Sequence, residues 1–242
     1  MAEASLWGAV GASSLLLGAI LGLALRIPST AIGLILGFGA GTLISALSFE
    51  LTEEAFHLGG ADAVALGLGL GALAYFAGDR VIDRGGGGNR MSSTGEQAEG
   101  SAKALLLGAV LDGIPESAVI GITLLEGSGV GVAVLAAVFL SNLPEAISSS
   151  TGMKAAGGRP ARILGEWVVV VVASAAAAAV GYGALDGASG NALAVIQAFA
   201  AGAVLTMLVD TMVPEAHRRA GNMVGLVTVL GFALAYLLST LE

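Results

Sequence analysis

The sequence predicts an all-α integral membrane protein with eight transmembrane helices in a 3+2+3 inverted-repeat arrangement. Three observations lead to this fold class. Hydrophobic residues make up 56% of the 242 positions and charged residues only 12%, which excludes an ordinary soluble domain of this length. Apolar segments long enough to span a bilayer follow one another along the chain. The pattern of two of these segments also recurs 161 positions later.

The order of the predicted helices follows from the apolar segments and the breaks between them. Gly59 and Gly60 separate the second helix from the third. Residues 83–101 contain four consecutive glycines and then a polar run, so we predict a flexible loop between helices three and four. We expect a single transmembrane domain over residues 1–242, with helices at about 6–25, 31–56, 61–82, 102–125, 130–151, 163–185, 192–214 and 223–241.

All ten Lys and Arg residues fall on one side of these eight spans. The positive-inside rule makes that side cytoplasmic, so we expect the loop over 83–101 inside and both termini extracytoplasmic. This predicts a multi-pass protein of the cell's inner or plasma membrane, surrounded by the lipid bilayer. The net charge of −8 argues against nucleic acid as a partner, and the lack of cysteine excludes disulfides and thiolate metal ligands.

An internal repeat relates the two ends of the chain. A shift of 161 residues pairs similar segments without a gap: Phe38–Gly41 with Phe199–Gly202, Glu54 with Glu215, Gly60 with Gly221, and Ala72–Tyr75 with Ala233–Tyr236. The shift maps helices two and three onto helices seven and eight, so copies five spans apart have opposite orientations in the membrane. Inverted repeats of this kind are typical of transporters, which bind their substrate near the midplane.

The two helices between these copies each carry a Pro-Glu pair, one ending in Glu116 and the other in Glu145. Each proline frees the carbonyl group four residues earlier. Further polar side chains lie about one turn before each Glu on the same face: Asp112 in the first helix, and Ser141 and Asn142 in the second. Both groups lie roughly 15–22 Å from the turn at residues 126–129, near the middle of a bilayer core roughly 30 Å thick. Carboxylates beside freed carbonyl groups at this depth indicate a cation site.

These x-Pro-Glu motifs on helices four and five, within an eight-span inverted repeat, resemble the ZIP family of divalent-metal transporters. The resemblance covers nearly the whole chain, and Phe199–Gly202 and Pro214–Ala216 of helix seven resemble bacterial members. It implies divalent metal transport by elevator-like alternating access, with a homodimer contact through helices two, three, seven and eight. The metal ligands that it implies are Asp112, Glu116, Ser141, Asn142 and Glu145, with Glu166 as a secondary ligand.

Several residues depart from the family pattern and bear on the choice of metal. Asp112 stands where the family has His, and Ser141 stands where many members have His or Gln. Gly113 stands where the family has Asn, and Ser117 and Ala146 each stand where Gly is usual. A site made only of oxygen ligands suits harder ions such as Mn²⁺, Mg²⁺ or Fe²⁺ better than Zn²⁺. The candidate substrates are therefore Zn²⁺, Mn²⁺, Fe²⁺, Cd²⁺ and Mg²⁺, and no cofactor is expected.

Other interpretations of the same residues stay open. The chain could be a transport-inactive family member that acts as a metal sensor or membrane scaffold, because the family's His is missing. An enzyme is not expected, since no histidine shares the depth of Ser141, the candidate nucleophile. Glu166 lies one turn from Arg162 and could be an interfacial residue. Glu50, Glu53 and Glu54 could be a solvated helix end or an acidic mouth that concentrates cations, with His57 as an entry ligand. Asp210 could line the inner exit or pair with a polar neighbour.

Overall fold

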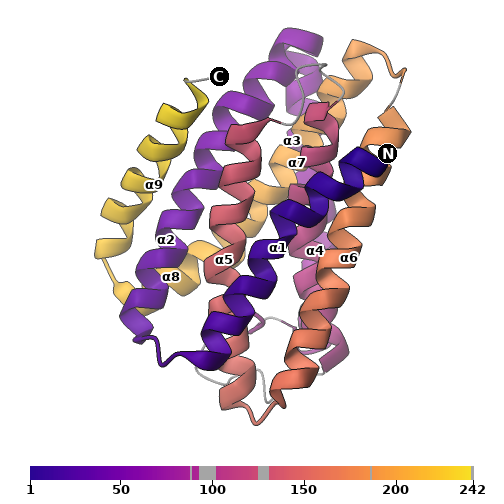
Figure 1. Cartoon of the computed structure of the whole chain (residues 1–242). Helices are drawn as coiled ribbons and strands as arrows, with labels where there is room; N and C mark the ends of the chain where they lie inside the picture. The colour runs from indigo at the N-terminus through magenta and orange to yellow at the C-terminus, as the bar shows by residue number, and fades with distance from the viewer. Residues whose placement is uncertain (88, 93–101, 125–130, 186, 241–242) are drawn as a thin grey trace.

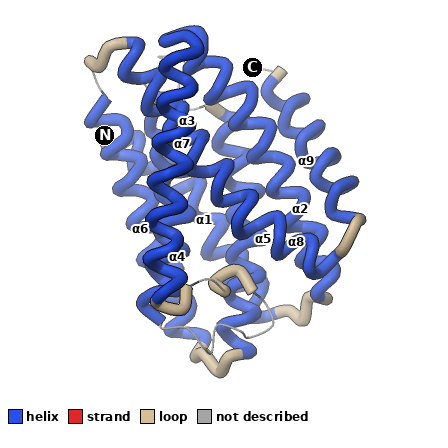
Figure 2. The backbone as a smooth tube through the Cα atoms, turned by 180° about the vertical axis from the view of Figure 1, so that it is seen from behind, coloured by secondary structure: helices blue, strands red, loops and turns tan. Residues whose placement is uncertain are grey.

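The structure is a computed structural model, and it describes residues 1–242 except 88, 93–101, 125–130, 186 and 241–242. The described residues form a bundle of α-helices, and no strand occurs among them (Figure 1). The view from behind shows the same all-helical packing (Figure 2). The predicted all-α class is therefore confirmed.

The helices begin and end close to the predicted apolar segments. In chain order they are α1 (Ala2–Ala24), α2 (Ser29–Ala46), α3 (Glu53–Arg84), α4 (Ala102–Thr123), α5 (Val132–Ala155), α6 (Pro160–Leu185), α7 (Gly190–Met207), α8 (Val213–Ala220) and α9 (Met223–Ser239). Two π-helical turns, η1 (Leu47–Thr52) and η4 (Leu208–Met212), join α2 to α3 and α7 to α8. Six helical stretches in the described residues are long and apolar enough to cross a membrane, and α9 is a shorter apolar helix.

Helices two and three of the prediction form one helical stretch, Ser29–Arg84, that is kinked at a single glycine. Gly60 has φ 70° and ψ −174°, a conformation that is strained for any residue with a Cβ atom. The predicted break at Gly59 and Gly60 is therefore present, although the helical hydrogen bonding continues on both sides of it. Gly221, between α8 and α9, has a similar conformation, with φ 58° and ψ −143°.

Structural features recur at the spacing of the sequence repeat. The π-helical turns begin at Leu47 and Leu208, which are 161 residues apart, as are the two kinked glycines. The packing also matches, because α3 lies against α7 while α2 lies against α9. At each of these crossings the two backbones touch: a Cβ on Gly71 would overlap the carbonyl oxygen of Phe199, and a Cβ on Gly231 would overlap that of Phe38.

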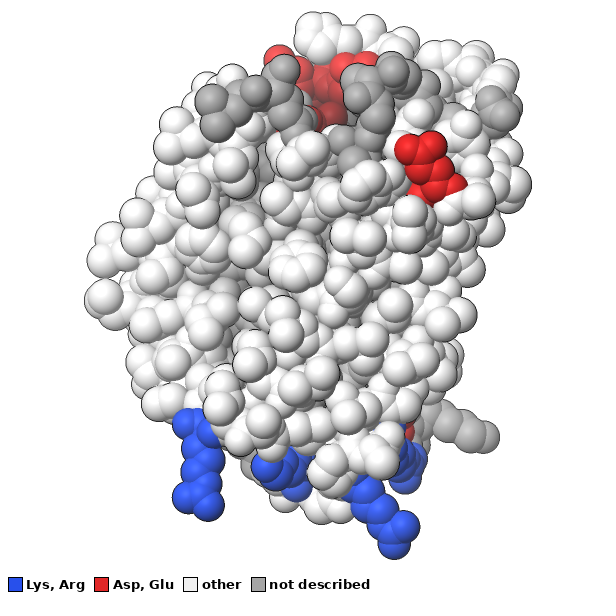
Figure 3. Space-filling model, viewed as in Figure 1, with Lys and Arg blue, Asp and Glu red and all other residues white. Residues whose placement is uncertain are grey.

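The two ends of the bundle carry opposite charge. Lys and Arg side chains gather at the lower end, and Asp and Glu side chains gather towards the upper end, where both termini lie (Figures 1 and 3). Lys154 at the end of α5 donates a hydrogen bond to the carbonyl of Leu23 in α1, and Arg219 donates one to Ser29 at 3.2 Å. These contacts place the ends of α1, α5 and α8 and the start of α2 together. We call this lower region the basic end.

The helices that carry the Pro-Glu pairs lie in the interior. α4 contacts α1, α3, α6 and α7, and α5 contacts α1 and α2. Every residue of α5 from Pro144 to Ser150 is buried. Leu107 and Ile114 of α4 and Val132 of α5 are exposed, but the polar side chains in the middle of both helices are buried, which is the environment expected for polar groups at membrane depth.

Candidate cation site

The two Pro-Glu pairs lie inside continuous helices. Pro115 is within α4 and Pro144 is within α5, so neither proline ends its helix. Gly39 of α2 packs on α5 at the carbonyl that Pro144 frees, since a Cβ on Gly39 would lie 3.3 Å from the carbonyl oxygen of Leu140. The loosened turn of α5 is therefore held closely by α2.

Five of the six predicted metal ligands are buried. Their exposed fractions are 1% for Asp112, 2% for Glu116, 1% for Ser141, 2% for Asn142 and 4% for Glu145. Glu145 interacts electrostatically with both Asp112 and Glu116, and Glu116 also interacts with Asp112. The structure thus brings carboxyl groups of α4 and α5 near one another, while their role as metal ligands stays a prediction.

Glu116 is buried without a hydrogen bond. Neither of its carboxyl oxygens has a hydrogen-bond partner among the described residues. It borders a cavity of about 10 Å³ whose other lining residues are apolar and come from α2, η1, α4, α5 and α7. A buried carboxylate without a partner is costly, so this group is expected to take up a proton or a cation.

Asp112 is held by a network that the sequence did not predict. Nε of Arg90 donates to one oxygen of Asp112 at 2.7 Å, and an outer nitrogen of Arg90 donates to the other oxygen at 2.9 Å. The hydroxyl of Tyr75 also donates to Asp112, and Arg90 donates to Asp79 at 2.7 Å. This two-point contact between guanidinium and carboxylate is the strong form of the ion pair.

Arg90 comes from the predicted flexible loop. In the described part of that loop, Arg90, Met91 and Ser92 are only 2–3% exposed, while residues 93–101 lie outside the described residues. The hydroxyl of Ser148 on α5 donates to the carbonyl of Met91, which fixes this segment on the bundle. The loop prediction rested on glycine and polar content, which did not anticipate this packing.

Arg90 needs space that only a glycine leaves. A Cβ on Gly108 of α4 would overlap Cδ of Arg90, so the side chain passes directly over Gly108. Burial lowers the pKa of Arg90, but the Asp112 carboxylate, with smaller contributions from Tyr75 and Asp79, raises it above its ordinary value. The guanidinium therefore carries a full positive charge beside the candidate site. Nothing in the sequence pairs Gly108 with Arg90, so this contact could not be predicted.

The structure does not bring Glu166 to the other candidate ligands. Its carboxylate pairs with Nε of Arg162 at 3.0 Å, and its side chain is 20% exposed. Gly113, next to Asp112, faces Ser174 and Val170 on α6, so Glu166 lies a turn or more nearer the basic end. These contacts match the alternative interpretation of Glu166 as an interfacial residue. Its assignment as a secondary ligand has no geometric support.

Within the part of the chain that the structure describes, no three Asp, Glu or His side chains stand in a geometry that would hold one metal ion. Arg90 occupies both oxygens of Asp112. Glu116 and Glu145 are left as the carboxyl groups at this depth that Arg90 does not bind directly.

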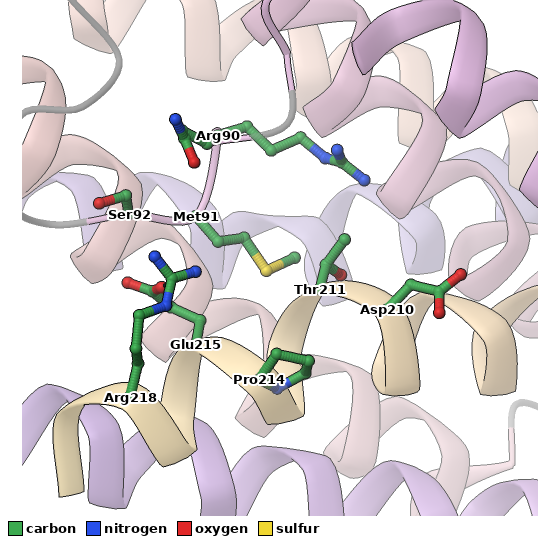
Figure 4. A pocket seen from close by; sticks show the side chains of 9 residues that line it. Arg90, Met91, Ser92, Asp210, Thr211, Pro214, Glu215 and Arg218 are labelled. Atoms are coloured by element: carbon green, nitrogen blue, oxygen red, sulfur yellow. The ribbon is translucent and has the colours of Figure 1, made fainter.

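Acidic and polar residues also line pockets at both ends of the bundle. At the end with the termini, an open pocket of about 580 Å³ is lined by Phe49, Glu50, Glu53, Glu54, His57, Tyr236 and Ser239. Near the basic end, Asp210 and Glu215 border a cavity of about 40 Å³ together with residues 89–92 (Figure 4). Glu215 pairs there with Arg219 and, at 2.9 Å, with Arg218. In Figure 4 the Arg90 side chain extends away from this pair.

Comparison with known proteins does not assign the chain to a family. No protein-family model matches it, and no curated protein matches it either. The likeness to the ZIP family therefore rests on the motifs and repeat described above.

Proposed function

We propose that the chain is a divalent-metal transporter that resembles the ZIP family, with eight membrane spans in a 3+2+3 inverted repeat. The recurrence of the π-helical turns and kinked glycines at the 161-residue spacing supports the repeat. In this interpretation α4 and α5 lie between the copies and hold the substrate site. The inner or plasma membrane, a basic cytoplasmic end and extracytoplasmic termini follow from the positive-inside rule.

One observation carries the proposal: Glu116 is fully enclosed, and both of its oxygens are without a hydrogen-bond partner among the described residues. A structural carboxylate would be expected to have its oxygens satisfied by nearby donors. A transported cation needs such an unsatisfied ligand, because the ion itself supplies the missing partner. Glu145, which is buried and whose charge interacts with that of Glu116, is the second ligand of the same ion.

The candidate metal-ligand atoms at this depth are all oxygens. Carboxylates, the hydroxyl of Ser141, the amide oxygen of Asn142 and the carbonyl freed by Pro144 make a hard ligand set. Such a set favours Mn²⁺, Mg²⁺ or Fe²⁺ over Zn²⁺. We therefore take Mn²⁺ as the first substrate to test, with Zn²⁺ and Cd²⁺ as competitors.

A second candidate is a transport-inactive relative that senses metal or serves as a scaffold. The Arg90–Asp112 pair favours it, because a cationic side chain already occupies one of the predicted ligands. The two candidates differ in a direct measurement. Purified protein in liposomes should accumulate Mn²⁺ in the lumen if it transports, whereas a sensor would bind Mn²⁺ without accumulating it. Protein-free liposomes give the background rate.

A further inference from the structure

Three carboxylates lie close to the guanidinium of Arg90. Its outer nitrogen atoms lie 2.7 Å from Asp79 and 3.9 Å from Asp83, in addition to the two contacts with Asp112. Asp79 and Asp83 are one helical turn apart on α3, and Asp83 is exposed at its end. The guanidinium thus bridges from a carboxylate on the interior helix α4 to carboxylates near the basic end.

The carboxylates that Arg90 contacts form a file that leads from the candidate site towards the basic end. Asp112 lies in the interior of α4, Asp79 is buried on α3, and Asp83 is exposed at the end of α3. Asp210 borders the cavity of about 40 Å³ that residues 89–92 also line (Figure 4). A divalent cation leaving the site towards the basic end would find successive oxygen ligands along this file.

Arg90 and a divalent cation cannot occupy this file together. The guanidinium takes both oxygens of Asp112, and its charge also acts on Glu145. A second positive charge a few ångströms away in the interior would be repelled by the guanidinium, because charges are screened less there than in water. The guanidinium is held at the end of a short segment outside the helices, fixed by the Ser148–Met91 hydrogen bond and by the turn after α3. It can therefore leave without unwinding a helix.

We propose that Arg90 is a tethered cation that competes with the transported ion for Asp112 and closes the path from the mid-membrane site to the basic end. The proposal rests on the transport function proposed above. When the ion is absent, Arg90 neutralises Asp112 and Asp79. When the ion moves to Asp112, Arg90 withdraws from this carboxylate and both of its oxygens become available to the ion.

The direct test is Mn²⁺ binding to the full-length purified protein, measured by electron paramagnetic resonance or calorimetry. Arg90→Gln removes the competing charge and should lower the Kd for Mn²⁺ by about ten-fold or more. Arg84→Gln is the matched control, because it makes the same change of charge at an exposed position at the end of α3. Its Kd should equal that of the wild type. An unchanged or weaker affinity in Arg90→Gln would overturn the proposal.

Asp79→Asn separates two roles of Asp79, because they predict opposite changes in Mn²⁺ affinity. If Asp79 were a ligand of the bound ion, its loss would weaken Mn²⁺ binding. If Asp79 anchors Arg90, its loss should loosen the guanidinium and tighten Mn²⁺ binding several-fold. Gly108→Ala should act in the same direction without any change of charge, because its methyl group would displace the Arg90 side chain. These variants also serve if Arg90→Gln does not fold, and weaker binding in both would contradict the proposal.

The failure of this proposal is distinguishable from failure of the transport function. If the wild type accumulates Mn²⁺ and Arg90→Gln has the same Kd, Arg90 has no competing role and the transport function stands. If neither protein binds Mn²⁺, Zn²⁺ or Cd²⁺, both proposals are wrong. Lower Kd in Arg90→Gln and Asp79→Asn, together with an unchanged Arg84→Gln, is the result that the tethered-cation proposal predicts.

Discussion

Arg90 holds both carboxylate oxygens of Asp112, at 2.7 and 2.9 Å, although the two residues come from a loop and from the middle of an apolar helix. Both side chains are buried, with exposed fractions of 2% and 1%. The position of the segment 89–92 therefore depends on the charge of the Asp112 carboxylate in α4. It also explains why the one aspartate in the predicted ligand set is not free to bind an ion in this structure.

Breaking this pair from one side should destabilise the protein. Asp112→Asn leaves a buried guanidinium with fewer partners, and such single changes typically cost about 3–5 kcal/mol. The double variant Arg90→Gln with Asp112→Asn should cost less than the sum of the two single changes, because it leaves no uncompensated charge at this point. Thermal unfolding in detergent, followed by circular dichroism, measures all four proteins. Strictly additive losses would show that the two residues do not stabilise each other.

The crossing of α3 and α7 should be sensitive to one added methyl group. Gly71→Ala would place a Cβ against the carbonyl oxygen of Phe199 and should force the helices apart, with loss of stability of about 1–3 kcal/mol. Gly69→Ala is the matched control two residues away, since a Cβ there meets no atom within 4 Å. It should leave stability unchanged or raise it slightly, because alanine favours the helix. Equal melting temperatures for the two variants would contradict the packing described here.

The repeat makes a parallel prediction for the crossing of α2 and α9. Gly231→Ala would meet the carbonyl oxygen of Phe38, whereas Gly225→Ala in the same helix meets no atom within 4 Å. The loss of stability in Gly231→Ala should therefore resemble that in Gly71→Ala. A neutral Gly231→Ala beside a destabilised Gly71→Ala would argue that the two crossings are not equivalent and would weaken the repeat.

The orientation of the bundle can be tested with single cysteines, because the natural sequence has none. Asp62 is exposed just after the kink at Gly60, and Arg159 is exposed in the turn before α6 at the basic end. A membrane-impermeant maleimide applied to intact cells should label Asp62→Cys and spare Arg159→Cys until the membrane is opened. Labelling of both from outside would contradict the eight-span arrangement with a cytoplasmic basic end.

Much of the fold could be predicted from the sequence because apolar length and glycine breaks are local signals. The kink at Gly60 needed a residue without a Cβ, and the paired glycines there marked it. The π-helical turns could not be predicted, since Leu47–Thr52 and Leu208–Met212 have no composition that separates them from ordinary helix. Only their shared spacing relates them to the repeat.

The candidate site residues that lie within the apolar helices could be predicted from the sequence. Glu116, Glu145 and Asp112 were identified because a carboxylate is conspicuous in an apolar segment. Arg90 was missed because its burial depends on a tertiary contact over Gly108 and on a hydrogen bond from Ser148, and neither is visible in a polar, glycine-rich loop. Glu166 was named a secondary ligand, with an interfacial residue one turn from Arg162 as the alternative, and its ion pair with Arg162 agrees with the alternative.

The central claim is that Glu116 and Glu145 share one transported cation, and Mn²⁺ uptake into liposomes by single variants tests it most directly. Glu116→Gln and Glu145→Gln keep the shape of the side chain but remove its charge, so each alone should reduce uptake to the protein-free background. Asp62→Asn, an exposed carboxylate outside the proposed site, should retain wild-type uptake. Wild-type uptake in either Glu116→Gln or Glu145→Gln, with comparable amounts of folded protein, would contradict the claim.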